Sequence, residues 1–233
     1  MQFELALVMP VYNEQEVVAE VVQSWREELD RLGIRFQILV LNDGSTDGTQ
    51  AQLETFLGDS RICVINKPNS GHGPTILLGY RQAVDQAPWV FQTDSDNEMQ
   101  PSHFGEFWRQ REDYDGLFGI RRGRIQGLGR RAITAVSRAT VALRFGRGVA
   151  DVNVPYRLMR SEVLKPIVAR IPDDTFAPNV IISGAFARWG ARIANIPVPY
   201  EGRKTGTVSI VKWKLWKAAM RSFWQTLTYR DER

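Results

Sequence analysis

The stretch FQILVLNDGSTDGTQAQLETFL, residues 36–57, decides the fold class because it joins a strand pattern directly to a helix pattern. Residues 36–42 are short and almost continuously apolar, as is typical of a strand in a parallel sheet that is covered on both faces. Asp43 and Gly44 favour a turn, and Ser45 or Thr46 can cap a helix that is expected to end at Leu57. A strand, a polar loop and a helix in succession predict a βαβ unit.

The same order recurs along the first half of the chain. Further strands are expected at residues 3–12, 61–66 and 89–94, and further helices at 14–32 and 73–86. The less regular second half predicts strands at 114–121, 151–160 and 191–200 and helices at 127–146, from 161 onward and at 178–190. We therefore predict an α/β, Rossmann-like domain over residues 1–209, with a mostly parallel central sheet and flanking helices, followed by a C-terminal amphipathic basic helix over 210–233.

The charge of the chain is distributed unevenly. The 233 residues carry a net charge of +4, but residues 1–115 hold 19 acidic and 8 basic side chains, and residues 116–233 hold 7 and 22. This separation favours an anionic partner for the second half: a nucleic acid, a phosphorylated substrate or an anionic membrane surface. With no long apolar run, no signal-peptide pattern and a single cysteine, Cys63, we expect a cytoplasmic protein without disulfides.

Polar residues follow each of the first four predicted strands, at residues 10–14, 42–45, 66–73 and 94–96. In open α/β sheets ligands bind at the carboxyl ends of the strands. These four loops should therefore meet at one edge of the sheet and form one site.

Three acidic residues alternate after the fourth strand: Asp94, Asp96 and Glu98. Like charges in such proximity repel each other, and a hard cation such as Mg²⁺ or Mn²⁺ would remove that cost. A solvated acidic turn, or a helix start capped by Asp96, is the alternative. The position at a strand end favours the metal.

The other polar loops exclude some chemistries. Asp43 has a turn role and can also accept a hydrogen bond from a nucleobase. The loop with Gly71 and Gly73 can bring backbone close to a ligand, but it lacks the Gly-Lys-Ser/Thr ending of a P-loop. His72 and His103 have no partner at metal or triad spacing, and no Gly-x-Ser-x-Gly elbow is present.

Taken together and in order, these motifs resemble glycosyltransferase family 2 with its GT-A fold. The resemblance rests on VMPVYNE, LVLNDGSTDGT, the Asn-x-Gly-x-Gly loop and TDSD in the first half. In the second half, GIRRGRIQGLGRR, DVNVPYRLMRSEVL and GARIANIPVPYEGRKTGTVS resemble the polyprenyl-phosphate branch, typified by dolichyl-phosphate mannosyltransferase. The match extends to about Ser209.

The resemblance implies roles for individual residues. Residues 1–115 would form the half that binds the nucleotide sugar and the metal, and residues 116–209 the half that binds the acceptor. The nucleotide sugar would be held by Pro10, Tyr12, Glu14, Asp43, Gly71, Gly73 and Asp94. The metal, Mg²⁺ or Mn²⁺, would be held by Asp94, Asp96 and Glu98. Asp96, Arg121, Arg157 and Arg203 would be catalytic, the arginines lying near the donor or acceptor phosphates.

Three departures from the family pattern bear on the substrates. Asn42 replaces a common Asp, NVPYR replaces the usual Ser-Gly-Phe-Arg, and Asn179 stands near where relatives often have an acid. An alcohol acceptor needs a general base, whereas a phosphate monoester is already ionised and needs none. The missing acid and the many arginines favour a phosphate acceptor. The resemblance implies that this acceptor is a polyprenyl phosphate and that the donor of the hexose is a GDP- or UDP-sugar.

Two other functions are compatible with the sequence: transfer to a hydroxyl of a glycan, lipid or protein, and non-catalytic nucleotide-sugar binding in support of a membrane enzyme. Asp94 and Asp96 argue against the second, and no base-stacking motif indicates nucleic-acid binding. One face of the C-terminal helix is apolar and aromatic, with Lys214, Lys217 and Arg221 along one edge. This face either packs on the body or lies on the inner surface of a membrane.

Overall fold

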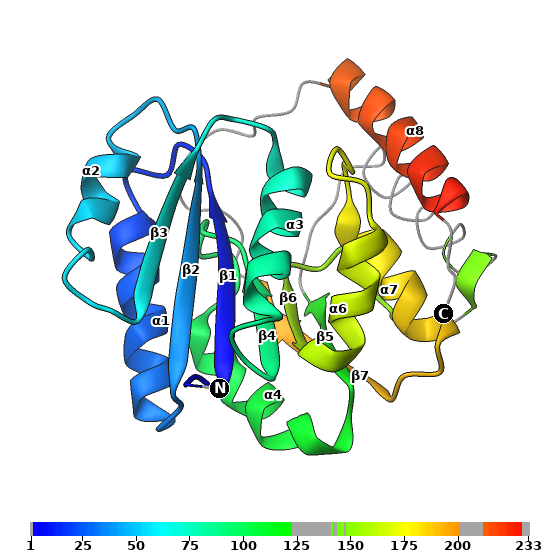
Figure 1. Cartoon of the computed structure of the whole chain (residues 1–233), viewed down its shortest axis with the longest axis horizontal. Coiled ribbons are helices and arrows are strands. Elements are labelled where there is room, and N and C mark those ends of the chain that lie inside the picture. The colour runs from blue at the N-terminus through cyan, green and yellow to red at the C-terminus, as the bar shows by residue number, and fades with distance from the viewer. Residues whose placement is uncertain (1, 123–140, 142–143, 147, 201–211, 230–233) are drawn as a thin grey trace.

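The structure, a computed structural model, describes residues 2–122, 141, 144–146, 148–200 and 212–229. Its centre is a seven-stranded sheet in the order β3-β2-β1-β4-β6-β5-β7 (Figure 1). The strands are β1 (Leu5–Val11), β2 (Phe36–Asp43), β3 (Ile62–Lys67), β4 (Trp89–Thr93), β5 (Gly116–Arg122), β6 (Tyr156–Arg160) and β7 (Ile193–Pro199). The helices are α1 (Val18–Arg31), α2 (Thr49–Glu54), α3 (His72–Ala83), α4 (Phe104–Gln110), α6 (Ser161–Arg170), α7 (Pro178–Arg188) and α8 (Lys212–Thr228), with short 3₁₀ turns η1 (Pro101–His103) and η2 (Arg111–Asp113).

The strand directions confirm the predicted mostly parallel sheet. β1 lies parallel to both β2 and β4, and β2 lies parallel to β3. β6 runs antiparallel between β4 and β5, and β5 is parallel to β7. Because the first four strands run in one direction, the loops that follow them meet at one edge of the sheet.

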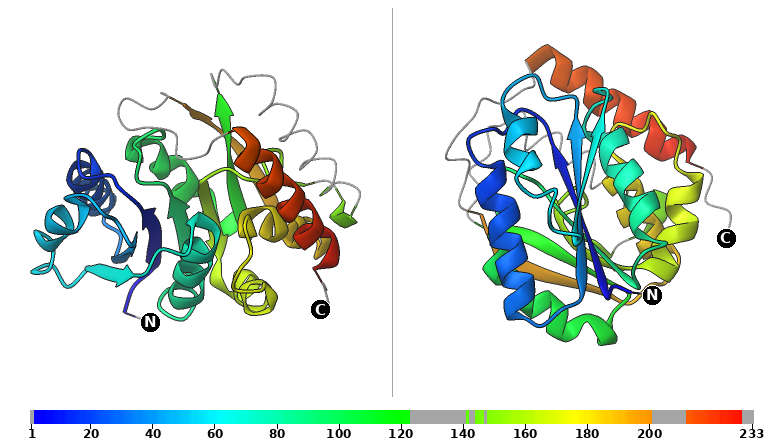
Figure 2. Two further views of the ribbon diagram at one scale, coloured as in Figure 1. Left: turned by 90° about the horizontal axis from the view of Figure 1, so that it is seen from above. Right: turned by 60° about the vertical axis from the view of Figure 1, so that its left-hand side comes forward.

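Helices cover both faces of the sheet. α3, α6 and α7 lie on one face and α1 lies on the other (Figures 1 and 2). On the α1 face, the Trp25 ring lies 5.1 Å from Phe91 of β4 and 5.8 Å from Phe104 of α4, centroid to centroid. On the α3 face, a methyl group on Gly79 would lie 2.4 Å from a Val8 methyl carbon, so a glycine is needed for α3 to approach β1 this closely.

Some element boundaries differ from the prediction. The strand expected over 151–160 begins only at Tyr156, because the backbone N–H of Val154 bonds to the Asp151 carbonyl, at 3.2 Å, and makes a turn. Most of the arginine-rich helix expected over 127–146 lies outside the described residues. The expected C-terminal helix is present as α8.

The described part of α8 contacts the body through polar residues. Ser222 and Thr226 of the helix are buried, as is Tyr229 directly after it, and Arg221 bonds to Asp174. Met220, Trp224 and Leu227 are exposed by 54%, 59% and 36%, respectively. The described part of α8 therefore turns its apolar stripe away from the protein.

Candidate active site

The loop after β1 is tied to the loop after β2. The Asn13 N–H donates to the Ser45 hydroxyl (3.0 Å), and the Asn13 side-chain oxygen accepts from the Thr46 N–H (2.8 Å). Asn13 adopts a left-handed φ of 53°, which asparagine tolerates better than most residues.

Three predicted nucleoside contacts fall in or beside the β1 loop, with different exposure. Pro10 is buried inside β1, where it pairs with Leu41. Glu14 is 9% exposed. Tyr12 is 41% exposed, so among these three it presents an accessible aromatic ring.

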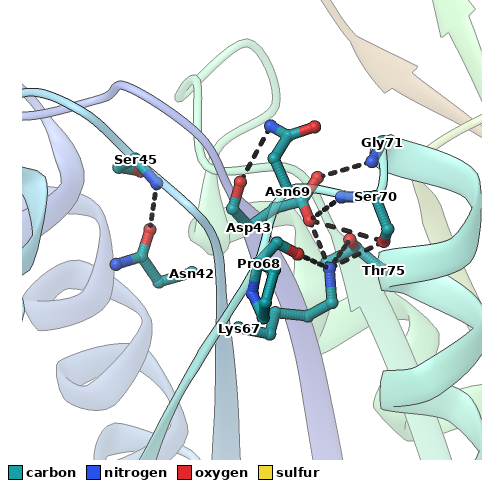
Figure 3. A network of polar contacts seen from close by, with 9 residues as sticks. All are labelled: Asn42, Asp43, Ser45, Lys67, Pro68, Asn69, Ser70, Gly71 and Thr75. Atoms are coloured by element: carbon teal, nitrogen blue, oxygen red, sulfur yellow. Dashed lines mark hydrogen bonds and ion pairs between the residues drawn. The ribbon is translucent and has the colours of Figure 1, made fainter.

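Asp43 at the end of β2 forms the centre of a second cluster (Figure 3). One carboxylate oxygen accepts from the Ser70 N–H (2.8 Å) and from the Lys67 ammonium. The other oxygen accepts from the Gly71 N–H at 2.9 Å. The carboxylate is 5% exposed, so in this structure it holds the loop before α3 and has little surface for direct contact with a nucleobase.

Lys67 completes the cluster, although it belongs to none of the predicted site residues. Its ammonium also donates to the Pro68 carbonyl (2.8 Å), the Ser70 hydroxyl (2.7 Å) and the Thr75 hydroxyl (3.2 Å). Burial alone would raise the pKa of Asp43, but the hydrogen bonds from Lys67 and Ser70 outweigh burial and hold that pKa below its ordinary value. The only signal in the sequence was that Lys67 ends the third strand, as Asp43 ends the second; the structure makes the two residues register partners on adjacent strands.

The two predicted glycines have different structural roles. Gly71, with φ +91°, precedes α3 and gives its N–H to Asp43. A methyl group on Gly73 would lie 2.2 and 2.3 Å from the carbonyl oxygens of Phe176 and Thr175. Gly73 therefore allows α3 to contact the loop between α6 and α7.

The predicted metal ligands follow β4 directly. The Asp96 carboxylate accepts a hydrogen bond from the Glu98 N–H at 3.2 Å. This bond makes the local acidic turn that was the alternative to a metal site. Among the described residues, no group of three or more His, Cys, Asp or Glu side chains is placed to hold a metal ion by itself. The backbone turns at Asn97, which has a φ of 56°. The segment is therefore not an extended strand in which Glu98 would point the same way as Asp94 and Asp96.

The electrostatics of Asp94 nevertheless suit a cation. Burial raises its pKa to about 7; the Arg121 charge opposes this rise, and the Glu98 charge adds to it. A cation would stabilise the ionised carboxylate. Mg²⁺ and Mn²⁺ often use only one or two carboxylates and take their remaining ligands from substrate phosphates and water. Asp94 and Asp96 fit that use.

His72 lies beside this group, although its sequence spacing gave no reason to place it there. Its Nε2 atom is 3.7 Å from an Asp94 carboxylate oxygen, and its side chain is 59% exposed. Only the three-dimensional approach of α3 to the end of β4 brings the two side chains together.

The three predicted arginines differ in their surroundings. Arg121 of β5 makes two bonds to the Asp151 carboxylate, at 2.7 and 2.8 Å, and both side chains are mostly buried. Arg157 is 0% exposed and donates to backbone carbonyls, including those of Val154 (2.9 Å) and Asn179 (3.1 Å). This placement differs from the expected one beside a phosphate, because the guanidinium is fully buried and its N–H groups are bonded to backbone carbonyls. Arg203 lies outside the described residues.

Comparison with known sequences identifies the family of the chain. Residues 6–168 match the family described as Glycosyl transferase family 2. The undecaprenyl-phosphate 4-deoxy-4-formamido-L-arabinose transferase of Edwardsiella ictaluri is 26% identical over 206 residues, which are 87% of this chain and 61% of that protein. An uncharacterized glycosyltransferase of Synechocystis sp. is 29% identical, over 94% of this chain and 68% of that protein. The chain thus spans 61% of the length of the first of these relatives.

Solved structures share the fold. Glucosyl-3-phosphoglycerate synthase from Mycobacterium tuberculosis, in complex with Mn²⁺, UDP and glucosyl-3-phosphoglycerate, matches with a TM-score of 0.71 and 17% identity, over 97% of this chain and 80% of that one. S. aureus TarS in complex with UDP-GlcNAc matches with a TM-score of 0.63 and 17% identity, over 98% and 68%. At such low identity the likeness concerns the fold alone.

Proposed function

The chain belongs to glycosyl transferase family 2, and we propose that it transfers a hexose from a GDP- or UDP-sugar to a polyprenyl phosphate. The observation that carries the proposal is the position of Asp94 and Asp96, directly after β4, at the sheet edge where the loops after β1 and β2 meet. The relative named as an undecaprenyl-phosphate transferase supports the acceptor class. The structures with Mn²⁺ and UDP support the donor class.

The donor half, residues 1–115, binds the nucleotide sugar. Exposed Tyr12 is the stacking surface for the base, and the mostly buried Glu14 lies two residues further along the same loop. Asp43 contributes indirectly to donor binding. Its carboxylate accepts hydrogen bonds from the backbone N–H groups of Ser70 and Gly71 and so fixes the loop before α3. Gly73 keeps this loop against the acceptor half, residues 116–209, so that donor and acceptor parts are in contact.

The charge that develops on the leaving diphosphate is stabilised at the end of β4. Asp94 and Asp96 hold Mg²⁺ or Mn²⁺, which neutralises part of this charge when bound. Arg121, whose charge already acts on Asp94, is oriented by the two-pronged contact with Asp151. Preorganised positive charge of this kind stabilises a transition state without reorganisation during the reaction.

The environment of Asn179 favours a phosphate acceptor over a hydroxyl acceptor. This residue stands near where relatives often carry an acid, and it is 3% exposed. Its amide is bonded to Tyr80 (2.8 Å) and Gln92 (3.1 Å) within the core. Position 179 therefore supplies no general base, and an ionised phosphate monoester does not require one.

Access to a lipid-linked acceptor is assigned to α8, in residues 210–233. The exposed stripe of Met220, Trp224 and Leu227, together with the basic composition of this region, suits insertion at the interface of an anionic membrane. No helix in the described part of the chain has the length and apolar character needed to cross a bilayer. We place the enzyme at the cytoplasmic face of a membrane.

A product assay tests the proposal. The protein is incubated with a panel of GDP- and UDP-sugars and Mn²⁺, with a short polyprenyl phosphate or with the matching polyprenol. Sugar transfer to the phosphate and not to the alcohol is the expected result. Transfer to the alcohol would favour a hydroxyl acceptor, and nucleotide-sugar binding without any transfer would favour a non-catalytic role.

A further inference from the structure

A chain of buried polar side chains leads from the interior of the protein to Asp94. The Tyr80 hydroxyl of α3 donates to the Asn179 side-chain oxygen of α7 at 2.8 Å. The Asn179 amide nitrogen donates to the Gln92 side-chain oxygen of β4 at 3.1 Å. The Gln92 amide nitrogen donates to an Asp94 carboxylate oxygen at 3.0 Å. Residues of α3, α7 and β4 are thus linked in series to one carboxylate, which Gln92 alone of the three contacts.

The chain of hydrogen bonds has a direction. An ionised Asp94 can only accept, so Gln92 must turn its nitrogen toward Asp94 and its oxygen toward Asn179. Asn179 must then offer its nitrogen to Gln92 and its oxygen to Tyr80, whose hydroxyl closes the chain as a donor. Each amide is therefore held in one of its two orientations by its neighbours.

The packing of the core does not by itself explain why these three buried side chains are polar. Tyr80 and Gln92 are 0% exposed, and Asn179 is 3% exposed. Buried amides and hydroxyls cost free energy unless every partner is present, whereas apolar side chains of the same size pack without that requirement. A polar network in a core whose side-chain atoms all have partners instead rigidifies the groups at its end, and here the end is Asp94.

We propose that Gln92 is a positioning residue, fixed by Asn179 and Tyr80, that orients the Asp94 carboxylate for a divalent cation. This inference rests on the proposed function, because it assumes that Asp94 is a metal ligand. Groups that hydrogen-bond to metal-binding side chains commonly set ligand orientation and metal affinity.

Binding of Mn²⁺ alone, followed by electron paramagnetic resonance of the free ion, tests this role without any turnover. Gln92→Met keeps the length of the side chain and removes its N–H donor, and we expect it to weaken Mn²⁺ binding about tenfold. Ser161→Ala is the matched control. It removes a buried hydroxyl that donates to the Ala87 carbonyl (2.5 Å), just before the opposite end of β4. We expect this control to lower the melting temperature but not the Mn²⁺ affinity.

A double-mutant cycle separates positioning from general stability. Tyr80→Phe removes the hydroxyl at the end of the hydrogen-bond chain that is farthest from Asp94. In the wild-type background it should weaken Mn²⁺ binding by about two- to threefold. In the Gln92→Met background it should have no effect on Mn²⁺ binding, because the effect of Tyr80 passes through Gln92. Additive losses, or wild-type affinity in either single variant, would overturn the inference and leave the proposed function standing. A wild-type protein that binds no Mn²⁺, either alone or in the presence of UDP or GDP, would overturn both.

Discussion

Replacing Asp43 by Asn removes the charge at the centre of the Asp43–Lys67 cluster while keeping the shape of the side chain. Asp43 and Lys67 are 5% and 15% exposed, so the variant leaves a nearly buried ammonium without its carboxylate. Breaking such a pair commonly costs about 3–5 kcal/mol. Lys67 retains bonds to Pro68, Ser70 and Thr75, so we expect the lower end, about 3 kcal/mol of unfolding free energy.

The control is a similar pair at the surface. Asp85 accepts from Lys165 at 2.6 Å, but the two side chains are 63% and 60% exposed. Asp85→Asn should therefore cost no more than about 1 kcal/mol. Urea unfolding of the wild type and the two variants measures both values. An Asp43→Asn protein as stable as the Asp85→Asn protein would refute the reasoning, because it would mean that burial does not strengthen the first pair.

The stability difference should also depend on pH with a defined sign. The folded-state pKa of Asp43 lies below its ordinary value of 3.8. Its ionised form therefore stabilises the fold fully above pH 4 to 5, and this contribution is lost as the pH falls through the folded-state pKa. The difference in unfolding free energy between the wild type and Asp43→Asn should be constant from pH 7 to 5 and become smaller below pH 4. In assays near neutrality, the variant should raise KM for the donor, because the Gly71 loop loses its anchor.

Three further outcomes follow from the structure. Asp96→Asn should abolish transfer while keeping the wild-type melting temperature, and EDTA should inhibit the wild type; normal turnover in either case would contradict the metal role. Gly73→Ala should destabilise by about 1–3 kcal/mol because the added methyl meets backbone, whereas Gly58→Ala, with open space around it, should be near neutral. Trp224→Ser should reduce retention on anionic vesicles, with salt weakening retention of the wild type, whereas Leu57→Ser, at another exposed apolar site, should not.

The strand pattern made the donor side of the fold predictable. Runs such as residues 36–42 are apolar and bounded by turn residues, and a parallel arrangement follows from the helices between them. Once the sheet is parallel, the loops after its strands must share an edge, so the grouping of Tyr12, Asp43 and Asp94 near one edge needs no further information. The second half was harder, because a turn at Asp151 interrupts what reads as one long strand.

Contacts between distant residues were not predictable in the same way. Lys67 and Asp43 are 24 positions apart and meet only because β2 and β3 pair in one particular register. Gln92 and Asn179 are 87 positions apart, and their contact depends on how α7 packs against β4. Motif spacing reports the local chain, whereas these partners are set by tertiary packing.

The arginines show why residue type and motif order do not determine a role. Arg121 and Arg157 both stand in segments that resemble the same enzyme branch, and both were expected near phosphates. Arg121 pairs with the Asp151 carboxylate, and its charge acts on Asp94. Arg157 has no exposed surface, and it donates hydrogen bonds to backbone carbonyls around the turn before β6. A buried guanidinium that satisfies carbonyls is a structural group, and removing it would unfold the turn that presents Asp151 to Arg121. The two arginines are therefore linked in series: Arg157 supports the turn, the turn places Asp151, and Asp151 orients the guanidinium of Arg121, which we propose acts on the leaving diphosphate.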